Sequence, residues 1–305
     1  MSVVKRRLAT ALAVAAVLGV APQAWGEAAP DRARSGAYYG VHGGIIAAFV
    51  AGGLLLQGAR PMEPGPDPQW FPGDSSVRFN DSPGAAALSN VTVALTVSGP
   101  AFAELARGLD YRLLNAGVVY GETLTANFAL NAVVKVLFAR PRPYTQGPHT
   151  HDPSLDDPKD RYTSFYSGHS SLAFAAAVSG SYLFAEAARD QGSRIAFWAT
   201  EFTLAAATAT LRVRAGKHYY SDVVVGALVG VGLGIGVPLI HGASYAPRPW
   251  EYLAAGSGLV GGVVAAELLP LKDGAGTSTA EALLHSLRLN VPIRGGATLS
   301  FAGAF

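Results

Sequence analysis

The amino-acid sequence predicts an all-α protein built as a bundle of long helices. Half of the 305 residues are hydrophobic and only 14% are charged, so the chain can bury a large apolar core. The apolar residues gather in runs long enough for helices of five or more turns, and polar connections separate these runs. No fixed repeat and no series of alternating strand-like segments divides them. We therefore expect the helices to pack against one another.

The first 26 residues have the pattern of a secretory signal peptide. A basic start at residues 5–7 precedes an apolar stretch that ends near residue 21, and the small residues Ala24 and Gly26 stand before Glu27. An uncleaved membrane anchor is the alternative, although the apolar run is shorter than the roughly 20 residues that a span needs. Either reading predicts export from the cytoplasm.

Three regions follow the predicted signal peptide. Residues 27–87 begin with a Gly- and Ala-rich apolar run at 41–56. A proline-rich stretch follows at 58–89 and overlaps the start of the next region, and we interpret it as a long surface loop. The helical bundle is predicted over residues 88–245, with apolar segments at 88–106, 113–139, 168–187, 194–213 and 221–240. Residues 246–305 are interpreted as a C-terminal extension, with an apolar segment at 251–269 and an irregular or hairpin tail at 287–305 that has no catalytic role.

Charge and cysteine content narrow the classes of partner and site. The net charge of +2 is small, and no basic run occurs after the first few residues, so we expect no nucleic-acid partner. The chain has no cysteine, which excludes disulfides and thiolate metal sites.

The first polar cluster stands where the segment 113–139 ends. Lys135 and Arg142 are seven residues apart, so they would share a helix face, and Pro141 and Pro143 stop the helix there. The two cations would then meet at one helix end, although a pair of interfacial basic residues is the alternative. We interpret the neighbouring Arg140 as a bystander.

The second and third clusters stand at the starts of two further helices. In Ser167-Gly168-His169, the glycine allows close backbone approach and the free N–H groups of a helix start attract an anion, although a simple cap and turn is the alternative. His218 and Asp222 stand four residues apart, as neighbours on a helix face do, but a capping pair has the same spacing. Arg212 precedes them across a bend that contains a glycine.

The order and spacing of the three clusters resembles the type 2 phosphatidic acid phosphatase superfamily. The pattern is Lys-x6-Arg-Pro, then Ser-Gly-His, then Arg-x5-His-x3-Asp, and the resemblance covers about residues 88–240. That superfamily includes membrane lipid phosphatases, soluble bacterial acid phosphatases and vanadium-dependent haloperoxidases. The resemblance implies its helical-bundle fold and the hydrolysis of phosphate monoesters or diphosphates through a phosphohistidine, with no metal and no cofactor.

The resemblance also implies a role for each residue. The phosphate oxygens would be held by Lys135, Arg142, Ser167, Gly168 and Arg212. His169 would protonate the leaving oxygen, His218 would be the nucleophile, and Asp222 would orient His218. These roles are physically consistent, because fixed cations stabilise the charge of a phosphoryl group in transfer and a carboxylate fixes the tautomer of an imidazole.

Two positions depart from the pattern of the superfamily. Tyr166 stands where a proline usually begins the second motif, and Leu211 stands where a serine usually precedes the arginine of the third. Both positions adjoin the expected phosphate-binding groups. The departures therefore put the strength of phosphate binding and the substrate preference in question more than the reaction.

Two other groups of residues receive an ordinary interpretation. The glycines at 230, 232, 234 and 236 look like a nucleotide-binding loop, but they lie inside an apolar helix. The spacing of the glycines at 226, 230 and 234 is that of close helix packing, which is the interpretation we favour. His149, His151 and Asp152 could bind a metal in the loop between the first two motifs, but they lack a further ligand at helical spacing, and a solvated loop is favoured.

The expected substrate is a phosphorylated lipid of the phosphatidic acid or polyprenyl diphosphate type, and the expected location is the cell envelope. Four arginines lie between helices at the end opposite the motifs, which predicts that this end faces the cytoplasm and the site faces the periplasm: Arg107, Arg112, Arg189 and Arg194. Glu122 and Glu201 weigh against lipid-facing helices, so a soluble periplasmic enzyme remains open.

Three alternative functions accompany this prediction. The first is a soluble periplasmic acid phosphatase acting on small phosphate esters. The second is a vanadate-dependent haloperoxidase, because vanadate mimics the phosphoryl transition state in the same pocket. The third is a non-catalytic envelope protein that binds lipid phosphates, for which Tyr166 and Leu211 are the only support.

Overall fold

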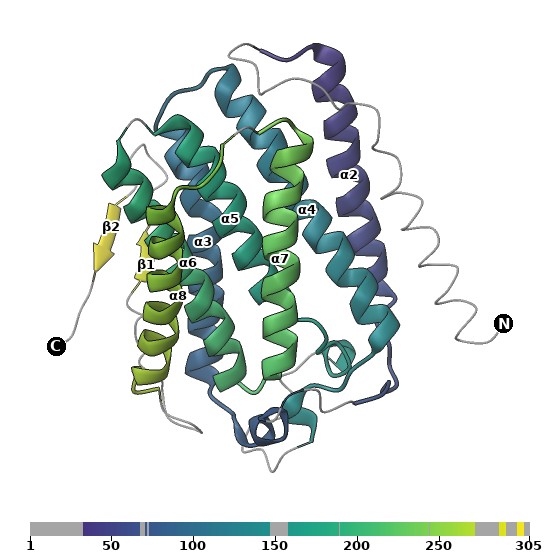
Figure 1. Ribbon diagram of the computed structural model, residues 1–305. Helices are drawn as coiled ribbons and strands as arrows, with labels where there is room; N and C mark the ends of the chain where they lie inside the picture. Colours follow the sequence, from purple (N-terminus) through teal and green to yellow (C-terminus); the bar gives the residue numbers. More distant parts are fainter. Residues whose placement is uncertain are drawn as a thin grey trace.

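Helices lying side by side make up most of the structure, a computed structural model that describes residues 33–67, 71, 73–146, 158–188, 190–243, 245–271, 287–290 and 298–301. Within these residues seven α-helices form one bundle (Figure 1). Their bounds are α2 Gly36–Gly58, α3 Pro83–Leu105, α4 Tyr111–Phe138, α5 Gly168–Ala187, α6 Gln191–Arg214, α7 Tyr220–Ile240 and α8 Pro249–Leu268. The predicted all-α bundle is confirmed, while the signal peptide predicted for residues 1–26 lies outside the described residues.

Polar side chains define where most of the helices begin. Five of the described helices start at a side chain that accepts a hydrogen bond from a backbone N–H of the first turn: Ser35, Ser82, Asp110, Ser167 and Asp190. A cap of this kind stabilises a helix by about 1 kcal/mol. α4 ends at Phe138; the next residue, Ala139, has a φ of 50° that turns the chain away, and Pro141 follows.

Small residues allow α5, at the centre of the bundle, to pack closely against α7. A Cβ atom on Gly230 would lie 2.3 Å from the carbonyl oxygen of Ser171, which shows that the two backbones nearly touch. Gly226 and Gly234 also lie close to α5 or its cap, so the interpretation of the glycines at 226, 230 and 234 as packing residues is confirmed. Gly258 lets α8 approach α6 in the same way, because a Cβ atom there would lie 2.5 Å from the carbonyl oxygen of Ala199.

The segment 58–89, which we interpreted as a long surface loop, is partly buried. It contains the 3-10 helix η1 (Asp74–Phe79), in which Asp74 and Val77 have no exposed surface. Asp74 accepts a hydrogen bond from the backbone N–H of Ser221 at 3.1 Å and so caps the start of α7. The surface-loop prediction was wrong for this stretch because the partner of Asp74 lies far away in the sequence.

The region after the bundle adds one helix and a small hairpin. α8 packs along α6, although it falls in the region that we assigned to a C-terminal extension. The strands β1 (Leu287–Asn290) and β2 (Thr298–Phe301) pair in antiparallel register, with Leu287 opposite Phe301. Two further 3-10 helices, η2 (Pro143–Thr145) and η4 (Pro158–Asp160), lie in the connection between α4 and α5.

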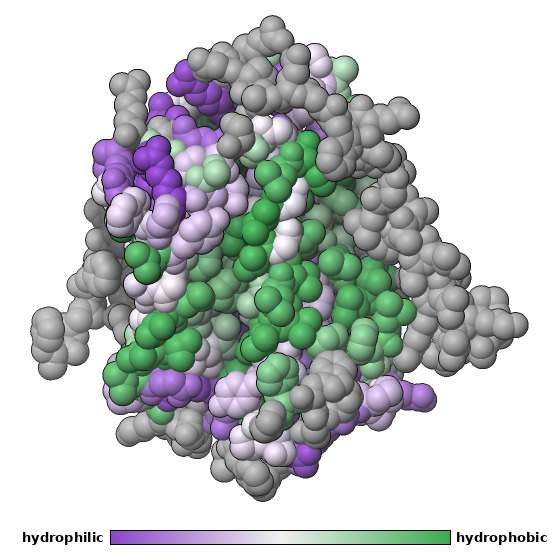
Figure 2. Space-filling model, in the orientation of Figure 1, coloured by the Kyte–Doolittle hydropathy of each residue, from purple (hydrophilic) through white to green (hydrophobic). Residues whose placement is uncertain are grey.

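One face of the bundle, formed by α7 and the lower part of α8, carries an apolar surface that is called the apolar face below (Figure 2). Among the described residues, α2, α3 and α7 are long and apolar enough to cross a membrane. Apolar side chains cover α7 and the lower part of α8 in Figure 2, and Leu228 and Leu268 are among the exposed residues there. Glu122 and Glu201 are buried inside the bundle, so they do not weigh against a lipid-facing surface as the sequence had indicated.

Candidate active site

The predicted site residues come from four helix ends that meet at one end of the bundle, the lower end in Figure 1. Lys135 and Arg142 lie at and just after the end of α4, Ser167 to His169 at the start of α5, and Arg212 in the last turn of α6. His218 lies in the connection to α7, whose first turn holds Asp222. Arg142, Arg212 and Lys135 lie close enough to His218 for their charges to lower the pKa of its imidazole. Cations of the first and third motifs therefore meet at this end of the bundle, beside the start of α5.

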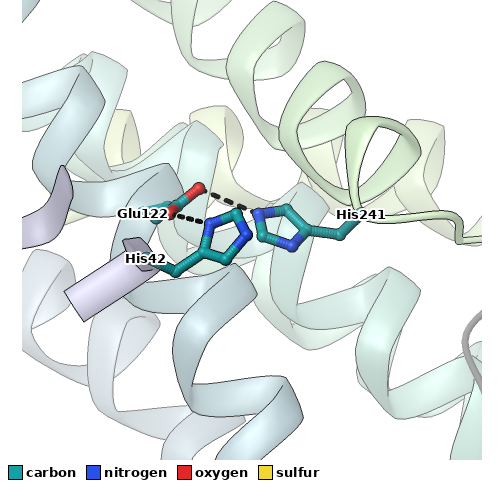
Figure 3. A group of neighbouring side chains, drawn as sticks. All are labelled: His42, Glu122 and His241. Atoms are coloured by element: carbon teal, nitrogen blue, oxygen red, sulfur yellow. Dashed lines mark hydrogen bonds and ion pairs between the residues drawn. The ribbon is translucent and has the colours of Figure 1, made fainter. Parts of the chain in front are cut away.

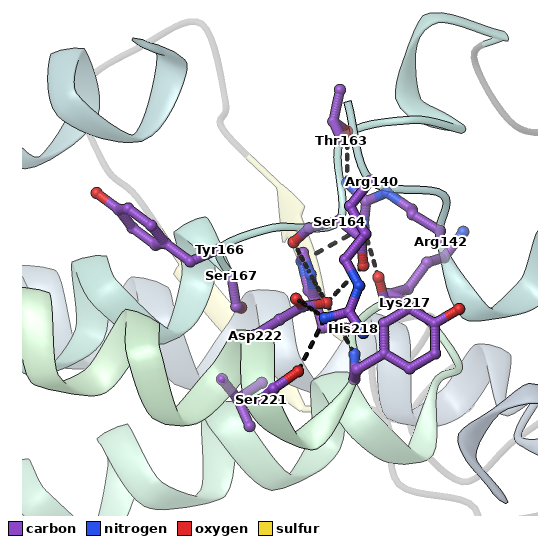
Figure 4. Close-up of polar contacts among 12 residues, drawn as sticks. Arg140, Arg142, Thr163, Ser164, Tyr166, Ser167, Lys217, His218, Ser221 and Asp222 are labelled. Carbon is purple, nitrogen blue, oxygen red and sulfur yellow. Dashed lines mark hydrogen bonds and ion pairs between the residues drawn. The ribbon is translucent and has the colours of Figure 1, made fainter. Parts of the chain in front are cut away.

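The imidazole of His218 is held in one tautomer. Its Nδ1 lies 2.8 Å from the carbonyl oxygen of Ser164, and because a carbonyl only accepts, Nδ1 carries the proton. The unprotonated Nε2 faces the Nη1 atom of Arg142 at 3.4 Å (Figure 4). Burial, followed by the charges of Arg142 and Arg212, lowers the pKa of His218 well below its ordinary value. The ring is therefore neutral and presents a lone pair towards the cations.

Asp222 does not contact His218 in the way the sequence had predicted. Its Oδ2 atom is 3.8 Å from Nδ1 of His218, which is longer than a hydrogen bond. Oδ2 instead accepts the hydroxyl of Ser164 at 2.6 Å and the backbone N–H of Tyr219 at 3.0 Å. Since the carbonyl of the same Ser164 accepts the hydrogen bond from Nδ1–H of His218, Asp222 acts on the imidazole through Ser164.

Arg140, which we interpreted as a bystander, lies at the centre of a buried ion network. Its Nη1 donates to Oδ1 of Asp222 at 2.7 Å, and its Nη2 lies 3.2 Å from Oδ2 of Asp74. Nε pairs with Asp67 at 3.1 Å, and the guanidinium lies 4.0 Å from the centre of the Tyr219 ring. The bystander interpretation was therefore wrong: Arg140 fixes the carboxylate that holds Ser164.

Arg142 is fixed from several sides. Its Nε donates to the carbonyl oxygen of Asp160 at 2.8 Å, its Nη1 donates to that of Lys217 at 3.0 Å, and its Nη2 lies 3.0 Å from the Asp160 carboxylate. Burial alone would raise the pKa of Asp160, but the charges of Arg142, Lys135 and Arg60 outweigh it and hold that pKa well below its usual range. The guanidinium is thus preorganised beside Nε2 of His218.

The start of α5 supplies backbone donors at the same place. Ser167 caps this helix by accepting the N–H of Ser170 at 3.3 Å, and its own N–H donates to the carbonyl of Asp222 at 3.0 Å. A Cβ atom on Gly168 would lie 2.8 Å from the side-chain oxygen of Asn131, so a larger residue does not fit without movement. The free N–H groups of a helix start favour a bound anion.

His169 and Arg212 are held by α3, a helix that no motif had indicated. Nε2 of His169 lies 2.8 Å from the side-chain oxygen of Asn90, and Nη1 of Arg212 donates to the hydroxyl of Ser89 at 3.3 Å. Burial, then the charges of Arg212 and Lys135, lowers the pKa of His169 well below its ordinary value. A bound phosphate dianion would offset those charges and favour the protonated ring.

The two unusual residues, Tyr166 and Leu211, do not line the cation cluster. The ring of Tyr166 is buried and points away from the charged side chains in Figure 4, while its carbonyl accepts a hydrogen bond from Asn131 at 2.9 Å. Leu211 has no exposed surface and packs in an apolar cluster with Ala85 and Leu271. Both residues support the scaffold, so the doubt that the sequence raised about phosphate binding does not apply to their side chains.

Several residues of this site could not be selected from the sequence. Ser164, Asp160, Asn90 and Asp74 belong to no spaced motif, and their partners lie far away along the chain. Arg140 had one available signal, because it stands inside the first motif beside Pro141. The candidate metal ligands His149, His151 and Asp152 lie outside the described residues.

Comparison with protein families identifies the part of the chain in which the predicted site residues lie. Residues 116–246 match the family model described as the PAP2 superfamily, and this range contains all eight predicted site residues. No curated protein and no solved structure matches the chain. Members of this superfamily are generally phosphatases that act on phosphate esters. The helical core between residues 116 and 246, with the cation cluster at its end, thus belongs to the PAP2 superfamily.

Proposed function

We propose that the protein hydrolyses phosphate monoesters or diphosphates of lipids through a phosphohistidine on Nε2 of His218. The observation that carries the proposal is the orientation of this ring, with Nδ1 held by the Ser164 carbonyl and Nε2 turned towards Arg142. A nucleophilic imidazole needs a free nitrogen lone pair aimed at the phosphorus. The tautomer of His218 leaves Nε2 as the nucleophile, and the adjoining Arg142 provides the positive charge that attracts the phosphoryl oxygens.

The first step forms one bond and breaks one. Nε2 of His218 attacks the phosphorus, the P–O bond to the leaving group breaks, and His169 gives its proton to the departing oxygen. The charge on the phosphoryl oxygens is stabilised by Lys135, Arg142 and Arg212, together with the hydroxyl of Ser167 and the backbone N–H of Gly168. Fixed cations of this kind supply the stabilisation that a metal ion gives in other phosphatases.

The second step regenerates the enzyme. His169, now neutral, takes a proton from water, the water oxygen attacks the phosphorus, and the P–N bond to His218 breaks. The imidazolium character that His218 acquires in the intermediate is supported by the carbonyl of Ser164, which Asp222 holds in place. Asp222 is therefore proposed as a positioning residue that acts through Ser164.

The apolar face supports a lipid substrate and a location at the membrane. Three helices long enough to cross a membrane, with exposed leucines and valines on α7 and α8, favour membrane association over a soluble periplasmic enzyme. The side chains of Arg107, Arg112 and Arg194 lie around a cavity at the end opposite the site. By the positive-inside tendency, we propose that this end faces the cytoplasm and that the site faces the periplasm.

A kinetic panel tests the reaction and the substrate class together. Purified protein is assayed with and without detergent against a lipid phosphate, a lipid diphosphate and a soluble aryl phosphate, next to His218→Asn and the exposed control Arg112→Ala. We expect phosphate release from the lipids, loss of release in His218→Asn and full release in Arg112→Ala. Activity on the soluble ester alone, in protein that purifies without detergent, would contradict the lipid proposal. Halide oxidation after vanadate loading would favour the haloperoxidase alternative.

The absence of cysteine from the sequence makes the orientation testable by single-cysteine labelling. Ser75 is exposed at the site end and Gln191 is exposed at the opposite end. A membrane-impermeant maleimide applied to spheroplasts should label Ser75→Cys at once and Gln191→Cys only after permeabilisation. The reverse pattern would show that the site faces the cytoplasm, and equal labelling would indicate that the protein does not cross the membrane.

A further inference from the structure

A second polar cluster lies inside the bundle, away from the site described above. Its members are His42 on α2, Glu122 on α4 and His241, the residue that caps the end of α7 (Figure 3). Their side chains are only 12%, 10% and 3% exposed, respectively. Glu122 is 13 residues before Lys135 on the same helix, which corresponds to roughly 20 Å along its axis. The phosphatase mechanism uses none of the three.

The geometry of the cluster is that of a ligand set. One carboxylate oxygen of Glu122 lies 2.5 Å from Nδ1 of His42, and the other lies 2.8 Å from Nε2 of His241. One donor atom from each residue lies within 4.8 Å of the other two. Two imidazoles and a carboxylate form a donor set that suits Zn²⁺ and related divalent ions, with one coordination position left for water.

A neighbouring tyrosine provides the outer contact that a metal-binding histidine usually has. The hydroxyl of Tyr38 lies 2.6 Å from Nδ1 of His241, the ring nitrogen that faces away from Glu122. Arg34 fixes the same turn, because its Nη2 donates to the carbonyl oxygen of His241 at 3.3 Å. Such outer contacts orient the ring and set its tautomer.

We propose that His42, Glu122 and His241 bind one divalent metal ion of the zinc class and thereby fasten α2 to α4 and α7. Ligand bonds of about 2.0–2.1 Å require the facing nitrogen and oxygen atoms to separate to about 3.3 Å, a small shift from the hydrogen-bonded distances. The ion binds Nε2 of His241, and the proton of that ring moves to Nδ1. This Nδ1–H then donates a hydrogen bond to the Tyr38 oxygen. Nδ1 of His42 likewise gives up its proton, which moves to Nε2 of that ring.

Solvent can reach the cluster from the end of the bundle opposite the phosphatase site, which we propose faces the cytoplasm. A cavity of about 820 Å³ opens there, and Tyr38 and His241 are among the residues that line it. A water molecule from this cavity can fill the open coordination position. The proposed site is thus accessible to ions although its three ligands are largely buried.

Metal titration of protein that carries no histidine tag tests the proposal. After chelator treatment and dialysis, Zn²⁺ binding is measured by calorimetry and Co²⁺ binding by the visible absorption of the ion. We expect one ion per chain in wild type, loss of that binding in Glu122→Gln, and an affinity about 10–100-fold lower in Tyr38→Phe, which keeps the fold and removes only the outer contact.

Two control variants locate the ion. His218→Asn removes an imidazole from the phosphatase site, and a His149→Asn, His151→Asn double variant removes those of the connecting loop. Both controls should bind Zn²⁺ as wild type does. The proposal is overturned if wild type binds no stoichiometric ion, if Tyr38→Phe binds as tightly as wild type, or if the loop double variant is the one that loses binding.

Discussion

Replacing Arg140 by Ala should destabilise the protein strongly. The guanidinium is 1% exposed, and its partners Asp74 and Asp222 have no exposed surface. Removing it leaves two buried carboxylates without their counter-charge. Breaking a buried pair in this way costs about 3–5 kcal/mol of unfolding free energy. For a chain of this size, at about 2–4 °C per kcal/mol, Tm should fall by roughly 6–20 °C.

The assay is thermal unfolding of the purified variants, with phosphate release measured well below Tm. Arg112→Ala is the matched control, because Arg112 is exposed at the opposite end and its loss should change stability by no more than about 0.5 kcal/mol. Arg140→Lys keeps the charge without the planar fork and should fall between the two. If Arg140→Ala unfolds within about 1 °C of Arg112→Ala, the buried network does not stabilise the protein in the way argued.

Three further predictions concern packing and protonation. Gly230→Ala should lower the free energy of unfolding by about 1–3 kcal/mol, because the added Cβ would meet the backbone of α5. Gly232→Ala, whose Cβ would have nothing within 4 Å, should leave the free energy of unfolding unchanged or raise it slightly. Chemical denaturation measures both. Leu211→Ser should lower stability by about 2 kcal/mol or more while KM stays unchanged, and a lower KM would show that this position contacts phosphate. The ring of His218 should give the ¹⁵N shifts of a neutral imidazole at pH 6, because its pKa is lowered and protonation requires a lower pH than for an ordinary histidine. Comparison with the spectrum of His218→Asn assigns the signals. A ring that is mostly protonated at pH 6 would contradict this.

The helices could be predicted from the sequence because long Gly- and Ala-rich apolar runs alternate with polar breaks. The segments predicted at 113–139, 168–187 and 221–240 agree with α4, α5 and α7 to within a few residues at each end. The motif residues could also be placed together, since each stands at a helix boundary. What limited the prediction was contact between distant parts of the chain.

Two residues illustrate that limit. Arg140 looked like a bystander because Asp74, one of its partners, is 66 residues away in the sequence. Asp222 was expected to bond His218 directly because they stand four apart, but the chain bends before α7 and Ser164 comes between them. Spacing along a helix predicts contact only where the helix is continuous.

The central claim is that His218 takes the phosphoryl group, and chemical trapping tests it most directly. Wild type and His218→Asn are mixed with substrate, quenched at alkaline pH to preserve phosphohistidine, and mapped by mass spectrometry. The account predicts phosphate on the peptide that contains His218 in wild type, and neither phosphorylation nor turnover in His218→Asn. Phosphate on His169, or continued turnover in His218→Asn, would contradict it.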